Sequence, residues 1–212
     1  MSQWQRVVPG GARWALAVVV QGCPRQSRLP GLGRALGVDH QAAAANWGVQ
    51  MFPEVITGDE EAVLLAAIER PLRRKRYSGA HFDGAIRDYR EIFKQEWPAE
   101  AQEILDRVRA RPELAEFAFN PAVHVLDLAP AGEIWPHVDS IKHAGPVIVG
   151  LSLLTQARMD FAPHEGDEAR FHFTHAVTAT TSTYEGNTVE RDRRISLLFR
   201  QEPSPAQLDL HD

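Results

Sequence analysis

The sequence predicts an α+β domain in which helices cover one side of an antiparallel β-structure with a jelly-roll centre. Helical periodicity occupies residues 57–71 and 98–111, whereas residues 122–200 contain short alternating stretches separated by Gly- or Pro-bearing turns. The chain has 212 residues, of which 44% are hydrophobic and 24% are charged. This composition is typical of one globular domain with a single sizeable core.

The first 38 residues have the composition of a targeting segment. They contain five arginines, no acidic residue and a short apolar run from Trp14 to Val20. This pattern predicts a mitochondrial transit peptide that is removed after import, with a secretory signal as the alternative. The apolar run is too short to cross a bilayer, so we expect no membrane span.

The charge balance excludes a general nucleic-acid binder. Without the five arginines of residues 1–38, the chain keeps 18 of its 23 basic residues against 28 acidic ones, which is a formal charge of −10. Any RNA contact would therefore be local. The single cysteine, Cys23, excludes an intramolecular disulfide framework.

Two helices are predicted in the first half of the chain. Thr57 and Glu60 have the spacing of a capping box, and Pro98 is suited to the start of a second helix. The first helix should end near Pro71. It is followed by a cluster of five basic residues within 70–76, which we interpret as a solvated helix end or as a local contact for phosphate or a partner. The residues expected on the buried sides are Val63, Leu64, Ala67 and Ile68 in the first helix, and Ala101, Ile104, Leu105 and Val108 in the second.

Strands are predicted at five places in the second half of the chain. Their expected ranges are 122–128, 133–139, 147–154, 170–176 and 193–200. The proline-bearing end, residues 202–212, predicts a flexible tail.

His137 and Asp139 form an H-x-D pair in the second predicted strand. In extended backbone, a spacing of two residues puts both side chains on one face. His175 follows Asp139 by 36 residues and lies in another predicted strand. Two imidazoles and one carboxylate are the protein ligands of a facial triad, which leaves positions on Fe(II) open for a co-substrate and dioxygen. We therefore predict a metal site at these three residues.

Other histidines are alternative ligands in principle. His172 would point away from His175 if both lie on one strand, so we set it aside. His164, in a polar turn, is the alternative that we retain.

The last predicted strand carries a second chemical pattern. Its polar residues are separated by even steps and share one face, and its apolar residues share the other. Guanidinium groups bind carboxylates bidentately, so this polar face is suited to a dicarboxylate beside a metal. The polar residues are Arg194, Ser196 and Arg200, and the apolar ones are Ile195, Leu197 and Phe199.

At these residues the chain resembles the AlkB family of Fe(II)- and 2-oxoglutarate-dependent dioxygenases, and most closely its mitochondrial branch. The resemblance extends from about residue 52 to about residue 201. It is strongest in VHVLDL at 123–128, PHVDSIK at 136–142, GLSLL at 150–154 and RRIS at 193–196. Nucleic-acid-repairing members usually carry Asn and Tyr where this chain has Leu126 and Leu128, and the mitochondrial branch shares these leucines.

The resemblance implies a double-stranded β-helix over residues 52–201. In it, His137, Asp139 and His175 would bind Fe(II), and Arg194 and Arg200, with Ser196 between them, would bind 2-oxoglutarate. It further implies the mitochondrial matrix as location. The implied substrates are N-methyl groups on mitochondrial RNA or a protein side chain, with an association with fatty-acid metabolism and programmed necrosis.

One departure from the family concerns the segment between the metal ligands. Members normally have an apolar strand, a Pro-Gly turn and another apolar strand before the second histidine, whereas this chain has a polar turn at residues 163–168. Without those two core strands, neighbouring strands would gain unpaired edges. Either the short segment completes the wall differently, or the chain is a non-catalytic interaction protein that retains the fold. A cupin-type metal enzyme without 2-oxoglutarate is a third hypothesis, which Arg194 and Arg200 disfavour.

Overall fold

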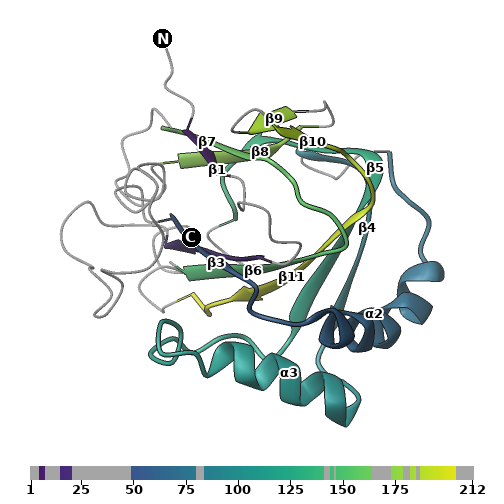
Figure 1. Ribbon diagram of the computed structural model, residues 1–212, viewed down its shortest axis with the longest axis vertical. Coiled ribbons are helices and arrows are strands. Elements are labelled where there is room, and N and C mark those ends of the chain that lie inside the picture. Colours follow the sequence, from purple (N-terminus) through teal and green to yellow (C-terminus); the bar gives the residue numbers. More distant parts are fainter. Residues whose placement is uncertain are drawn as a thin grey trace, which may run out of the picture.

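In a computed structural model of the chain, the described residues form mainly antiparallel strands in a curled sheet, with two helices among them on one of its outer faces (Figure 1). The residues described are 5–7, 15–20, 49–79, 84–140, 144–145, 147–163, 173–178, 182–184 and 187–203. The α+β class is therefore confirmed, and the curled sheet agrees with a jelly-roll-like arrangement.

The helices are α2 (Gly58–Arg73) and α3 (Ala99–Arg109). The first strands are β1 (Gln5–Val7), β2 (Ala15–Val20), β3 (Val49–Pro53) and β4 (Ile86–Lys94). They are followed by β5 (Val123–His137), β6 (Val147–Leu153), β7 (Met159–Pro163), β8 (Phe173–Val177) and β11 (Arg194–Arg200). A separate two-stranded sheet consists of β9 (Ser182–Tyr184) and β10 (Asn187–Val189).

Both predicted helices form, and the capping box is confirmed. The Thr57 hydroxyl accepts from the Glu60 backbone N–H at 3.2 Å, and the Glu60 carboxylate accepts from the Thr57 N–H at 2.8 Å. α2 continues two residues past Pro71, because fully buried Leu72 packs its last turn onto the core. No helix in the described part of the chain is long and apolar enough to cross a membrane.

The main core lies between the helices and the outer face of the sheet. β11 contributes Ile195, Leu197 and Phe199, each at most 1% exposed, which confirms the predicted apolar stripe. Alternate residues of β5, namely Val123 and Val125, face the same core. The residues that alternate with these, His124 and Leu126 on β5 and Arg194 and Ser196 on β11, therefore face the inside of the curled sheet.

β5 causes the sheet to curl. We predicted two strands, 122–128 and 133–139, but the structure has one strand of 15 residues. Its first half pairs with β11, and its second half pairs with β8 through Ile134 and His137. A register shift separates these two pairs, and a bulge of this kind bends a strand. One strand thus connects the two parts of the curled sheet (Figure 1).

The strands that the sequence did not predict are β1 to β4, β7, β9 and β10. β4 pairs with β5 over nearly its whole length, from Ile86 opposite Ile134 to Lys94 opposite Val123. Its sequence, IRDYREIFK, is rich in charged residues and lacks a regular apolar alternation. β7 lies between the predicted metal ligands Asp139 and His175, where we expected only a polar turn at residues 163–168.

The edges that we expected to be unpaired are covered by N-terminal residues. The strand order is β1-β7-β8-β5-β11-β6-β2-β3, so β1 is the outer neighbour of β7 and β2 is the outer neighbour of β6. β2 pairs with β6 from Ala15 opposite Ser152 to Val20 opposite Val147. The unpaired edges that we expected if the two family strands are absent are therefore not found on β6 and β7. The sheet also extends upstream of residue 52, into the segment whose composition predicts a leader.

Candidate metal and co-substrate site

The structure brings His137, Asp139 and His175 together. One ligand atom from each residue lies within 4.8 Å of the other two, as a shared metal requires. His137 and His175 are cross-strand partners of β5 and β8, and their ring centroids are 4.3 Å apart. β5 ends at His137, so the expectation that Asp139 belongs to the same strand is wrong. Asp139 follows in the loop, and its Oδ2 lies 3.9 Å from His175 Nε2.

The protonation of these residues suits metal binding. His137 Nδ1 lies 2.8 Å from the Trp135 carbonyl oxygen, which can only accept, so Nδ1 carries the proton and Nε2 keeps its lone pair. Burial lowers the pKa of His175 to about 4, which keeps this imidazole neutral near pH 7. Burial alone would raise the pKa of Asp139, but nearby His175 and Arg200 outweigh it and hold that pKa below its usual value.

Arg194 and Ser196 lie on the inner face of β11, as predicted. Both are buried, and Arg194 Nε donates to the Ser152 hydroxyl at 3.0 Å. Among the residues that the structure describes, no carboxylate forms an ion pair with Arg194. Burial, with a smaller effect of Arg191, lowers its pKa to about 10. A buried guanidinium without a counter-ion is unfavourable on its own, so this position is suited to an anionic ligand.

Arg200, the third predicted co-substrate residue, makes different contacts. Its Nη1 donates to His124 Nδ1 at 2.8 Å, and its Nη2 lies 3.8 Å from Asp139 Oδ1. Arg200 therefore contacts a predicted metal ligand, whereas the hydrogen bond of Arg194 is to Ser152. His124 is engaged at both ring nitrogens and is not a free ligand, whereas His143, His164 and His172 lie outside the described residues.

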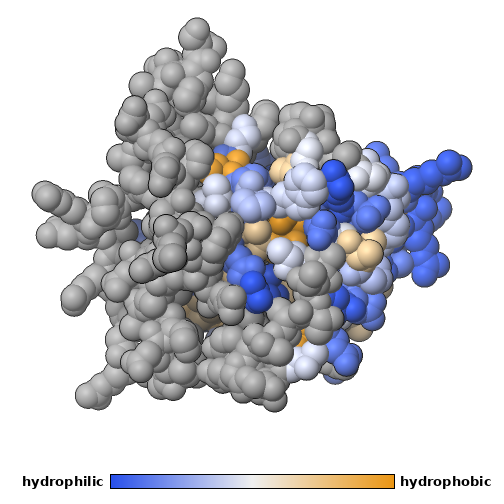
Figure 2. Space-filling model, turned by 90° about the horizontal axis from the view of Figure 1, so that it is seen from above, coloured by the Kyte–Doolittle hydropathy of each residue, from blue (hydrophilic) through white to orange (hydrophobic). Residues whose placement is uncertain are grey.

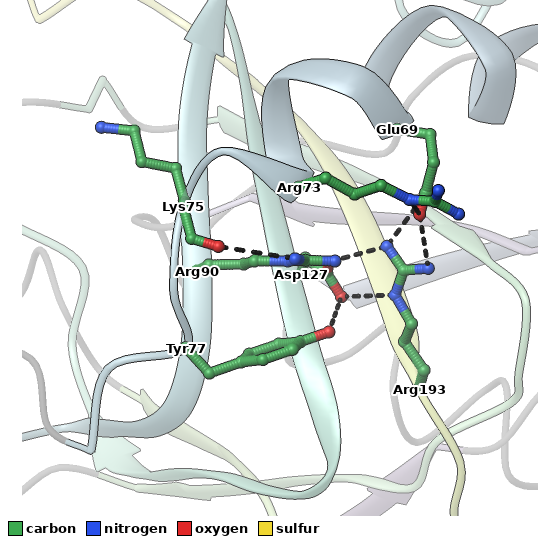
Figure 3. Close-up of polar contacts among 7 residues, drawn as sticks. All are labelled: Glu69, Arg73, Lys75, Tyr77, Arg90, Asp127 and Arg193. Carbon is green, nitrogen blue, oxygen red and sulfur yellow. Dashed lines mark hydrogen bonds and ion pairs between the residues drawn. The ribbon is translucent and has the colours of Figure 1, made fainter.

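A buried carboxylate on the opposite face of β5 accepts hydrogen bonds from several side chains outside this site (Figure 3). Asp127 is fully buried and accepts from Arg90 Nε at 2.7 Å and from Arg193 Nε at 2.9 Å. The Tyr77 hydroxyl donates to the same carboxylate at 3.2 Å. Arg193 Nη2 also reaches Glu69 of α2 at 3.1 Å. This network connects α2 to Arg193, the residue that directly precedes β11.

The roles of Asp127 and Glu69 were not predicted from the sequence. Asp127 occurred only as one letter of the VHVLDL run, between two apolar residues. Its position in the core phase of an apolar strand was an available signal, because a carboxylate at such a position requires cationic partners.

We expect Asp127→Ala to lower the free energy of unfolding by about 3 kcal/mol, because Arg90 and Arg193 would lose their shared buried counter-ion. Chemical denaturation followed by circular dichroism would measure this loss. Glu69→Gln is the matched control. Its side chain is 27% exposed, and we expect a loss of at most about 1 kcal/mol. Equal effects of the two substitutions would show that Asp127 does not anchor the network.

The basic cluster of residues 70–76 lies at the end of α2. Arg70, Arg73, Arg74, Lys75 and Arg76 are all exposed. Figure 2 shows strongly hydrophilic residues projecting on the right-hand side of the molecule, the side on which Figure 1 places this end of α2. The interpretation as a solvated helix end agrees with this exposure.

A curled antiparallel sheet that carries two histidines and one carboxylate beside a buried arginine defines a class of protein, the mononuclear non-haem iron oxygenases.

Comparison with known proteins identifies the family. No family model matches the chain. Two curated relatives are both named alpha-ketoglutarate-dependent dioxygenase alkB homolog 7, mitochondrial. The one from Mus musculus is 36% identical over 170 residues, covering 71% of this chain and 77% of the relative. The one from Bos taurus is 35% identical over 211 residues, covering 88% and 90%. The chain therefore belongs to the AlkB family of dioxygenases.

Proposed function

We propose that this protein is a Fe(II)- and 2-oxoglutarate-dependent dioxygenase that oxidises a C–H or N-methyl group. The observation that carries the proposal is the combination of the His137, Asp139 and His175 cluster with the buried guanidinium of Arg194. Membership in the AlkB family supports the same reaction class.

The residues of the site fit both groups. Three ligands on one side of a metal leave the other side for a co-substrate and dioxygen. When bound, iron and 2-oxoglutarate supply the oxidising chemistry, and the protein positions them. Arg194 and Ser196 would hold the distal carboxylate of 2-oxoglutarate, because the fork of Arg194 is buried and lacks an ion pair within the described residues.

The protein also controls the surroundings of the site. Leu126 and Leu128 belong to an apolar cluster with Ile134 and Val177, on the β5 and β8 elements that carry His137 and His175. This cluster gives the strands that carry the predicted ligands an apolar environment, in which electrostatic contacts are stronger than in water. The polar residues that repair enzymes carry at these two leucine positions are absent, so a base-repair substrate is disfavoured.

We further propose a double-stranded β-helix as the detailed fold and the mitochondrial matrix as the location. The curled sheet supports the fold, and the names of the relatives support a mitochondrial protein. The substrate would be methylated mitochondrial RNA or a protein side chain. The exposed basic cluster of residues 70–76 supports a local contact with a negatively charged substrate.

Decarboxylation of 2-oxoglutarate in the presence of Fe(II) and dioxygen, without a second substrate, tests the proposed function. We expect release of carbon dioxide from wild-type protein. If wild-type protein binds Fe(II) but neither binds nor decarboxylates 2-oxoglutarate, the proposal is wrong and a cupin-type site is favoured. If it binds both without turnover, the non-catalytic interaction protein is favoured.

We expect Arg194→Met to weaken 2-oxoglutarate binding at least about 30-fold, because truncating one partner of a buried charge pair costs about 2 kcal/mol or more. The melting temperature of the ligand-free protein should not fall, since the variant removes a buried charge that has no counter-ion among the described residues. Calorimetric titration with 2-oxoglutarate and a thermal melt would measure both quantities. Arg194→Lys is the matched control for charge, and it should bind more tightly than Arg194→Met and more weakly than wild type. Unchanged affinity in Arg194→Met would show that this residue does not bind the co-substrate.

A further inference from the structure

We propose that His124 and Glu91 are positioning residues that hold the Arg200 guanidinium against the predicted metal ligand Asp139. The inference rests on the proposed function, because it concerns the orientation of a ligand of the proposed iron site. It is carried by a continuous series of contacts from β4 through β5 and β11 to the loop after β5.

His124 is fixed on three sides. Its Nε2 lies 2.6 Å from Glu91 Oε2, and its Nδ1 lies 2.8 Å from Arg200 Nη1. Its ring stacks on Phe93, with centroids 4.5 Å apart and an interplanar angle of 12°. Only 6% of the residue is exposed. An imidazole held at both nitrogens and on one face has little freedom to rotate.

The two hydrogen bonds define the tautomer of His124. A guanidinium can only donate, so Nδ1 must accept from Arg200. The proton of the neutral ring is therefore on Nε2, where it is donated to the Glu91 carboxylate. Burial also lowers the pKa of His124, which favours this neutral form. Glu91 thus selects the tautomer that Arg200 requires, as the carboxylate partners of metal-bound histidines do.

Arg200, held by His124, in turn contacts Asp139. Its Nη2 lies 3.8 Å from Oδ1 of Asp139, whereas the other oxygen, Oδ2, is the one near His175 Nε2. The guanidinium therefore attracts one carboxylate oxygen and leaves the second directed toward the histidine ligands. Asp139 lies in a loop after the end of β5, so the strand itself does not fix its orientation. The guanidinium of Arg200, on β11, orients the Asp139 carboxylate instead.

Two substitutions of His124 separate its two hydrogen bonds. The amide oxygen of His124→Asn lies close to the position of Nδ1 and preserves an acceptor for Arg200. The amide nitrogen of His124→Gln lies close to the position of Nε2 and preserves only the donor to Glu91. Mn(II) is the probe for the metal site, measured by calorimetric titration of the full chain, and the melting temperature of each variant is measured in parallel.

We expect His124→Gln to weaken Mn(II) binding roughly 10-fold, the usual effect of losing an outer partner of a metal ligand, while His124→Asn retains most of the affinity. Glu91→Gln should also retain most of it, because its amide oxygen still accepts from Nε2. His124→Gln should therefore bind Mn(II) more weakly than the other two variants, while the melting temperatures of all three stay similar.

Equal Mn(II) affinity in wild type, His124→Asn and His124→Gln would overturn the inference and leave the proposed function intact. Equal losses in both His124 variants that follow equal falls in melting temperature would also overturn it, because they would indicate a purely structural role. Absence of Mn(II) binding by wild-type protein would overturn the proposed function, and this inference with it.

Discussion

We expect His137→Ala and Asp139→Ala each to abolish stoichiometric Fe(II) binding. Loss of an outer partner of a ligand typically weakens a metal site by about 10- to 100-fold, so removal of one of only three direct ligands should exceed that range. Asp139→Ala should have the greater effect, since it also leaves Arg200 near the site without a counter-ion. Elemental analysis after anaerobic loading and desalting would measure the iron content.

Two substitutions outside the site serve as controls for this experiment. Asp106 lies on α3 with 60% of its side chain exposed, so Asp106→Ala should keep a full complement of iron. His211→Ala removes a histidine from the predicted tail and should do the same. If both site variants retained one iron per chain, the assignment of the triad would be wrong.

The second large effect is expected from the N-terminal strands. Deletion of residues 1–20 would remove β1 and β2 and leave β6 and β7 without their outer neighbours. The free energy of unfolding of a domain is only about 5–15 kcal/mol, so the loss of two strands should abolish the cooperative thermal transition. The shortened protein should also expose strand edges and aggregate. Differential scanning calorimetry and gel filtration would detect both results.

A single substitution tests the same pairing with less disturbance. Ala17 pairs with Gly150 of β6 and with Met51 of β3, so β2 is an inner strand at this position. Ala17→Pro removes a backbone donor and should destabilise the sheet, because proline is not accommodated in central strands. Gln207→Pro, in the predicted tail, is the matched control. Unchanged melting temperatures in both the deletion and Ala17→Pro would show that residues 15–20 are dispensable, as the leader prediction requires.

The non-catalytic alternative was based on the short segment between Asp139 and His175. The structure pairs β7 with β8 through Phe161 opposite His175, and β1 and β2 cover the outer edges of β7 and β6. His175 therefore belongs to a strand with neighbours on both sides. The short segment itself no longer argues against an intact site.

The local pattern of the sequence was sufficient for several elements. The capping box at Thr57, the start of α3 after Pro98 and the two faces of β11 each follow from spacings within one element. The grouping of His137, Asp139 and His175 was also predicted, because a facial triad limits the residue types that are useful. The capping box, the start of α3 and the faces of β11 depend on residues a few positions apart, whereas His175 lies 36 residues after Asp139.

Only the tertiary structure decided which distant segments meet. It showed that β5 is one bent strand, that β4 supplies Glu91 to His124, and that Asp127 gathers Arg90, Arg193 and Tyr77 (Figure 3). It also placed residues 15–20 beside β6, although their composition alone predicts a leader. Strand pairing uses backbone groups that every residue carries, so the choice of a partner far away in the chain leaves little trace in the local sequence.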